Sequence, residues 1–185
     1  MTVPQVTGVR TGFFSPRSLV GGIVVGAILL AFGVGLPWLA RSLPGDDGFR
    51  AGQPYPVTTE VFITPAAGWV RDARRSDLGV TLTMINGAAE MTVYARQGGP
   101  DDVAAELDEV RATHATNGYL LTEPRAVQTP TGLTGTMISG SSTTAQLEAY
   151  VLTGGEQLIS VVGTWPREQD LGSEVQAMTA SLEVR

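Results

Sequence analysis

Uncharged residues form one long block near the start of this chain. Residues 18–40 contain no Asp, Glu, Lys, Arg or His. As a helix this stretch is about 35 Å long, enough to cross a hydrocarbon core of about 30 Å. A signal-peptidase cut after Ala40 would place Trp38 where a small residue is required. The pattern therefore predicts an uncleaved, single-pass transmembrane helix over residues 18–40.

The flanking charges only weakly constrain the orientation of this helix. Arg10 and Arg17 precede it and Arg41 and Arg50 follow it, so the arginine count is tied. The amino terminus adds one positive charge to the short N-terminal side, and large trailing domains cross the membrane largely regardless of their charges. We therefore expect a cytoplasmic tail over residues 1–17 and an extracytoplasmic location for everything after residue 40.

Small residues recur on the predicted membrane helix. Gly22 and Gly26 form a G-x-x-x-G pair, and Ala27 and Ala31 repeat the same spacing beside it. Small residues at this spacing allow helix backbones to approach closely in lipid. The four residues are candidate contacts with a partner helix, although glycine is also common in membrane helices that have no partner.

After the helix, the hydrophobic pattern changes to strand and helix periods. Residues 41–56 are rich in Gly, Pro and Asp and have neither period, so they predict a flexible linker before a domain over residues 57–185. Alternating or β-branched residues in that domain indicate six strands, and Asn86-Gly87 and Gly154-Gly155 indicate hairpin turns. The predicted strands are residues 57–64, 78–85, 90–96, 133–139, 145–153 and 157–163.

Two further segments have helical spacing. Apolar residues at this spacing face one side of each helix. The first helix begins around Gly99-Pro100-Asp101-Asp102 and ends at Asn117-Gly118. Antiparallel strands and two one-sided helices predict an α+β fold, in the order strands, helix, strands, helix, with both helices packed on the sheet. The two stripes are Val103, Leu107, Val110 and His114, and Leu171, Val175, Met178 and Leu182.

Two corners and the element order resemble a known fold. The segment Pro65-Ala66-Ala67-Gly68-Trp69 follows the first strand, Gly132-Leu133-Thr134-Gly135 opens the second set of strands, and a terminal helix follows a Gly-rich hairpin. Together they resemble the PsbP-like fold of the extrinsic photosystem II protein and of LpqN-type actinobacterial envelope lipoproteins, over residues 57–185. The resemblance implies an extracytoplasmic accessory or binding domain and carries over no functional residue. Unlike those lipoproteins, this chain has a predicted membrane helix and no lipid-modified cysteine.

The composition of residues 51–185 argues against several classes of function. They hold 16 acidic residues against 8 Arg, so nucleic acid is not an expected partner. The chain has no cysteine, which excludes disulfides, thiolate catalysis and zinc–thiolate sites.

Catalytic chemistry also finds little support in the sequence. His114 is the only histidine, and we interpret it as packed or capping rather than as a base or ligand, because it lies on the apolar stripe. Residues 139–144 (SGSSTT) lack the G-x-S-x-G elbow and indicate a turn. We therefore predict no enzymatic activity, no catalytic or metal-binding residue and no cofactor.

Each of three groups of residues has two possible interpretations. Three acidic residues on one face of the first helix could bind a cation or a basic partner, or they could form a solvated helix face, and we favour the solvated face. Three arginines close together in the sequence could recognise a ligand or pair with counterions, and we favour the pairing. Trp69 and Trp165, each at the end of an element, are either core anchors or docking residues for a partner. The acids are Asp102, Glu106 and Glu109, and the arginines are Arg71, Arg74 and Arg75.

Two functions of different class are consistent with these patterns. In the first, the chain is a non-catalytic accessory or interaction protein whose helix packs into a larger envelope membrane complex. In the second, the extracytoplasmic domain is a tethered module that binds a lipid or another apolar ligand.

Overall fold

The structure is a computed structural model and describes residues 49–185. The predicted cytoplasmic tail, the predicted membrane helix and its packing residues Gly22, Gly26, Ala27 and Ala31 lie outside the described residues. Within residues 49–185, none of the helices has the length and apolar character needed to cross a membrane.

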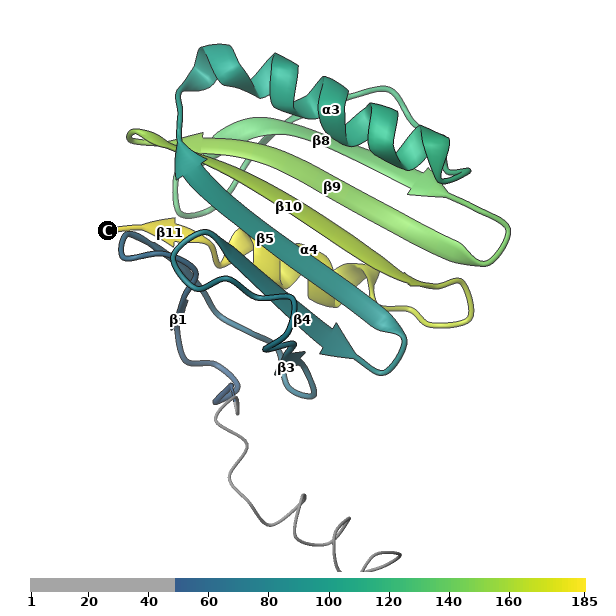
Figure 1. Cartoon of the computed structure of the whole chain (residues 1–185), viewed down its shortest axis with the longest axis horizontal. Helices are drawn as coiled ribbons and strands as arrows, with labels where there is room; N and C mark the ends of the chain where they lie inside the picture. Colours follow the sequence, from purple (N-terminus) through teal and green to yellow (C-terminus); the bar gives the residue numbers. More distant parts are fainter. Residues whose placement is uncertain (1–48) are drawn as a thin grey trace, which may run out of the picture. The chain divides into compact units, whose positions relative to one another are not determined.

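An antiparallel sheet of eight strands forms the centre of the domain (Figure 1). Its order is β3-β4-β5-β10-β9-β8-β6, with β7 also paired to β8. A smaller sheet has the order β1-β2-β11. The strands are β1 (Tyr55–Pro56), β2 (Val61–Ile63), β3 (Val70–Arg71), β4 (Thr81–Asn86), β5 (Ala89–Gln97), β6 (Leu120–Leu121), β7 (Arg125–Gln128), β8 (Thr134–Ser141), β9 (Ala145–Gly154), β10 (Gln157–Pro166) and β11 (Glu183–Val184).

Two helices cover opposite faces of the large sheet (Figure 1). Helix α3 (Val103–Thr116) follows a short 3-10 turn, η2 (Pro100–Asp102), and helix α4 (Gly172–Ala180) follows β10. Side chains alternate along β9, so Leu147, Ala149 and Val151 pack on the α3 side while Tyr150 and Leu152 pack on the α4 side. The sheet is therefore the middle of three layers, and the predicted α+β class is confirmed.

The predicted helical stripes are confirmed. Leu107 is buried on the α3 side and Val103 and Val110 pack around it. Val175 and Met178 are buried on the α4 side, where Leu182 joins them just beyond the end of that helix.

Glycines place both hairpin turns one residue later than the sequence pattern suggested. The two-residue loops are Gly87-Ala88 and Gly155-Glu156, and their first residues have φ of +62° and +59°. A left-handed glycine at the first loop position is the pattern of a type II′ turn, whose twist matches that of the strands. Asn86 is therefore the last residue of β4 rather than a turn residue.

The first predicted strand, residues 57–64, is interrupted. The Thr58 hydroxyl accepts hydrogen bonds from the backbone N–H groups of Glu60 (3.2 Å) and Val61 (3.0 Å), which turns the chain between β1 and β2. The ordered domain also begins before residue 57. Phe49 packs edge-to-face on Tyr55 with ring centroids 4.7 Å apart, so the end of the predicted linker belongs to the fold.

The second predicted strand starts later than expected. A turn over residues 77–80, closed by the Val80 N–H donating to the Asp77 carbonyl at 3.0 Å, delays β4 until Thr81. Val80 is 39% exposed instead of facing the core. Five strands were not predicted at all, because strands of two to four residues are too short to show a period. These are β1, β3, β6, β7 and β11.

Candidate functional site: an apolar groove beside helix α4

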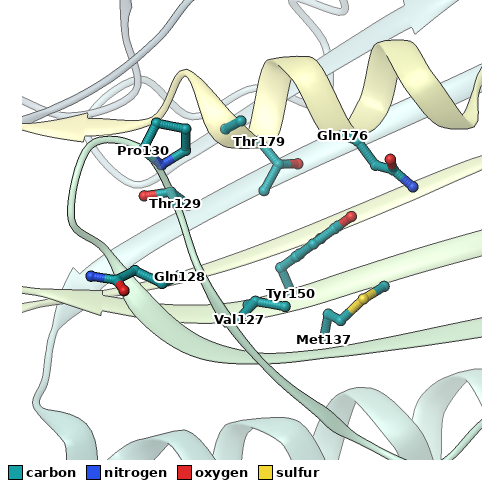
Figure 2. A pocket seen from close by; sticks show the side chains of 9 residues that line it. Val127, Gln128, Thr129, Pro130, Met137, Tyr150, Gln176 and Thr179 are labelled. Atoms are coloured by element: carbon teal, nitrogen blue, oxygen red, sulfur yellow. The ribbon is translucent and has the colours of Figure 1, made fainter.

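A groove of about 300 Å³ lies between α4 and the edge of the sheet (Figure 2). Strand β7 and the turn after it form one wall, α4 forms the other, and β8 and β9 form the floor. We call this hollow the α4 groove. Its lining residues are Val127, Gln128, Thr129, Pro130, Met137, Tyr150, Gln176, Thr179 and Ala180.

The position of α4 leaves this groove open. The helix packs directly on β10, since a Cβ added at Gly163 would lie 2.7 Å from Cγ1 of Val175. The α4 side of β8 and β9 is therefore only partly covered. Met137 and Tyr150 pair across these strands and share that uncovered surface, as Figure 2 shows.

A glycine also allows the two strands of the groove floor, β8 and β9, to pair closely. Val127 of β7 pairs with Gly135, which in turn pairs with Leu152 of β9. A Cβ at Gly135 would lie only 2.0 Å from the Val151 carbonyl oxygen, so no other residue fits this backbone. The Gly132–Gly135 corner noted in the sequence thus has a structural role beside the groove.

Polar groups at one end of the α4 groove bond to each other. The Tyr150 hydroxyl donates to Glu148 Oε2 at 2.7 Å, and Gln176 Nε2 donates to Glu148 Oε1 at 2.8 Å. Burial raises the pKa of Tyr150 above its usual value, and the bond to Glu148 adds to the effect. The hydroxyl is therefore protonated at neutral pH, and it donates its proton in the hydrogen bond to Glu148. The groove itself presents the aromatic ring, the Met137 thioether and aliphatic carbons, which suit an apolar ligand.

Both candidate docking tryptophans lie in the core. Trp69 is 2% exposed and its indole N–H donates to Glu174 Oε2 at 3.0 Å. Trp165 is 4% exposed and packs against Gly172, where an added Cβ would lie 3.3 Å from its ring. Burial removes the exposed ring that partner docking requires, so the core-anchor interpretation replaces the docking one.

His114 is half-buried and packs against an aromatic ring. It meets Tyr119 edge-to-face with ring centroids 5.8 Å apart. Burial lowers the pKa of His114, so the imidazole is neutral at pH 7. Residues 139–141 belong to β8, so the predicted turn is confirmed only for residues 142–144, where Ser142 Oγ accepts the Ala145 N–H at 3.1 Å.

The acidic helix face has structural partners. Asp102 Oδ2 accepts the Gly99 N–H at 2.8 Å and so caps the start of the helix, and Glu106 forms an ion pair with Arg96 at 3.1 Å. Glu109 is exposed. Among residues 49–185, no group of three His, Asp or Glu side chains gathers closely enough to hold a metal ion.

The arginine cluster also pairs with neighbouring groups. Arg75 bridges Asp72 and Glu90, and its hydrogen bond lowers the pKa of Asp72. Arg71 Nη1 donates to the Tyr55 hydroxyl at 3.1 Å, while Arg74 is exposed. Counterion pairing, the favoured interpretation from sequence, accounts for Arg75.

Sequence reasoning did not identify the groove residues. Strand alternation correctly predicts that successive side chains of β8 and β9 face opposite sides of the sheet. It does not reveal which of those side chains a helix leaves uncovered, because the groove is lined by residues that are distant in sequence, such as Val127, Tyr150 and Thr179.

Comparison with known proteins supports the fold. No protein-family model and no curated protein sequence matches the chain. The solution structure of cyanobacterial PsbP (CyanoP) from Synechocystis sp. PCC 6803 is similar, with a TM-score of 0.54 and 14% identity, over 78% of this chain and 98% of that one. A crystal structure from Bacteroides thetaiotaomicron VPI-5482 matches with a TM-score of 0.42 and 14% identity, over 77% of this chain and 49% of that one. The domain therefore has a PsbP-like fold.

Proposed function

We propose that this chain is a non-catalytic, single-pass accessory protein of a larger envelope membrane complex, with its PsbP-like domain on the extracytoplasmic face of the cell membrane. The observation that carries the proposal is the charge-free stretch of residues 18–40, joined by a short Gly-, Pro- and Asp-rich segment to a folded domain. The spacing of Gly22, Gly26, Ala27 and Ala31 supports a packed partner helix. As part of this proposal, the domain resembles LpqN-type actinobacterial envelope lipoproteins in particular.

The segment between the two parts supports a domain that works near the membrane. Only residues 41–48 separate the predicted helix from the described residues. At about 3.3–3.6 Å per residue, eight residues span less than about 30 Å even when fully extended. A domain on so short a tether stays close to the lipid surface and to any protein beside the helix.

A second candidate function rests on the α4 groove. Its apolar floor of Met137 and Tyr150 and its volume of about 300 Å³ suit an apolar chain, such as part of a lipid. In this alternative the domain is a tethered extracytoplasmic binding module, and the membrane helix serves only to keep it near its ligand.

Purification tests the two functions against each other. The full chain with a C-terminal tag is isolated from native membranes in mild detergent, and the bound proteins and lipids are identified. We expect a stoichiometric membrane complex that is lost in the double variant Gly22→Leu/Gly26→Leu. Isolation of the chain alone with a defined lipid, unaffected by those changes, would refute the accessory function and favour the binding module.

Cysteine labelling tests the orientation, because the chain has no cysteine of its own. Leu120 is 81% exposed, so Leu120→Cys provides an accessible thiol, and Thr7→Cys provides the matched site on the other side of the predicted helix. In intact cells an impermeant maleimide should label the first variant only. The reverse pattern would place the domain in the cytoplasm and contradict the proposal.

A further inference from the structure

A second hollow, of about 360 Å³, lies on the α3 side of the sheet. Strands β5 and β10 form its floor, with Glu90 directly opposite Thr164 and with Thr92 nearby. The end of α3 and the residues after it supply His114, Asn117 and Tyr119. We call it the polar hollow. It exists because α3 packs over β8 and β9 and leaves the neighbouring β5 surface open.

The polar hollow contains hydrogen-bonding groups that the fold does not use. Within residues 49–185, the side chains of His114, Asn117, Tyr119 and Thr164 make no hydrogen bond. In the α4 groove, by contrast, Tyr150 bonds to Glu148. The uncommitted groups of the polar hollow include hydroxyls, a carboxamide and an imidazole, which can both donate and accept. They converge on one space that is open to solvent.

The charge of the polar hollow selects a neutral ligand. Glu90 Oε2 accepts a hydrogen bond from Arg75, so its negative charge is offset by a fixed partner. The imidazole of His114 is neutral at pH 7 because burial lowers its pKa. None of the described residues that line the polar hollow is Arg or Lys, so an anion would lack a cationic partner there. A cation would have to compete with Arg75 for the Glu90 carboxylate.

An aromatic ring completes the set of groups. Tyr119 is half-buried beside the hollow and stands edge-to-face to His114, so part of its ring remains accessible. The negative face of an aromatic ring attracts the C–H groups of an apolar surface. Hydroxyls along an edge and C–H groups on a face occur together in a pyranose ring. The volume lies at the lower end of the range of about 300–1,000 Å³ for small-molecule sites.

We propose that the polar hollow binds one unit of a neutral carbohydrate. Thr164 and Asn117 would bond to its hydroxyls, the free Glu90 oxygen would accept from a further hydroxyl, and Tyr119 would pack against its C–H face. The proposal rests on residues 49–185 alone and is independent of the proposed membrane anchoring.

Saturation-transfer NMR on the full chain in phosphatidylcholine nanodiscs tests this proposal. Detergents with maltose or glucose headgroups are avoided because they would compete for the site. The probes are the methyl pyranosides of glucose, galactose, mannose and N-acetylglucosamine, with glucuronate and glucosamine as charged controls. The variant Thr164→Val removes one hydroxyl without changing size, and Thr164→Val/Asn117→Ala removes two polar groups. Thr134→Val is the matched control, since Thr134 is exposed on β8 and outside the hollow.

We expect at least one neutral pyranoside to receive saturation, and the double variant to bind it about tenfold more weakly or worse, while Thr134→Val binds like the parent. Competition then distinguishes two sources of the sugar. Stronger displacement by an oligosaccharide identifies a glycan chain, and stronger displacement by a glycolipid in the nanodisc identifies a lipid headgroup. The proposal is overturned if no neutral sugar binds, if only a charged control binds, or if both Thr164 variants bind like Thr134→Val.

Discussion

The close packing of α4 on Gly163 leaves the α4 groove open, and it allows us to predict how much stability the substitution Gly163→Ala would cost. The substitution Gly163→Ala adds one methyl group where Val175 Cγ1 would be 2.7 Å away and Cγ2 3.3 Å away. Real carbon atoms do not approach to 2.7 Å, so either the helix must move off β10 or Val175 must leave its preferred rotamer. Both responses destabilise the folded state.

The expected loss follows from two opposing effects. Overpacking a closely packed core costs about 1–3 kcal/mol. Replacing glycine by alanine also restricts the unfolded chain, which stabilises the fold by about 0.4–1 kcal/mol. The net loss for Gly163→Ala is therefore about 1–2 kcal/mol, equivalent to a fall in Tm of several degrees for a domain of this size.

A double-mutant cycle shows whether the contact itself is responsible. Val175→Ala removes both methyl groups that obstruct the new Cβ, at a cost of its own for the cavity created. If the clash causes the loss, Gly163→Ala should cost less in the Val175→Ala background, with a coupling energy between about 0.5 and 3 kcal/mol. Urea unfolding of the four proteins followed by circular dichroism measures this difference.

Gly99→Ala is the matched control. Gly99 has an ordinary φ of −120° and no atom within 4 Å of an added Cβ, so the substitution creates no clash. Because Gly99 is the N-cap residue of η2, where alanine is less favourable than glycine, we expect a loss of less than about 1 kcal/mol. Strict additivity of Gly163→Ala and Val175→Ala would refute the reasoning, because it would mean that the two positions do not touch. If Gly99→Ala lowered the free energy of unfolding as much as Gly163→Ala does, the effect would come from replacing a glycine in general and not from the contact with Val175.

Three further predictions concern the groove and the lone histidine. Gly135→Ala should cost about 3 kcal/mol or more, since the obstacle is the Val151 carbonyl oxygen rather than a flexible side chain, and a urea midpoint close to that of the parent would contradict this. Tyr150→Phe should cost about 1–2 kcal/mol through the lost bond to Glu148, yet leave the apolar floor of the groove intact, so the urea midpoint should fall while any apolar ligand still binds. The third concerns His114, whose imidazole takes up a proton near pH 6.5 when the chain is unfolded but only at lower pH when folded, so the unfolded state binds more protons and stability falls as the pH drops through this window. Thermal unfolding between about pH 7 and pH 5 should therefore show a flatter pH dependence for His114→Gln, and an unchanged profile would show that His114 does not contribute.

Local patterns in the sequence were sufficient for the main elements of the domain. Met91, Val93 and Ala95 alternate in β5 and are buried as predicted, because the two-residue period of a strand acts within a few residues. The apolar stripe of α3 and its end at Gly118, with φ of +83°, are equally local. The first predicted strand failed for a local reason too, since the hydroxyl of Thr58 competes with strand pairing.

Only the tertiary structure decided the roles of the candidate residues. Trp69 is a core residue because Glu174, 105 positions later, accepts its indole N–H, and no pattern near Trp69 reveals this partner. The α4 groove and the polar hollow likewise depend on where the helices pack. Helix α4 packs on Gly163 of β10, and helix α3 packs over β8 and β9. The sequence by itself determined which elements form and which of their faces are apolar, because those properties depend on neighbours a few residues away. The long-range packing determined which parts of those faces stay open, because it brings together side chains from distant parts of the chain.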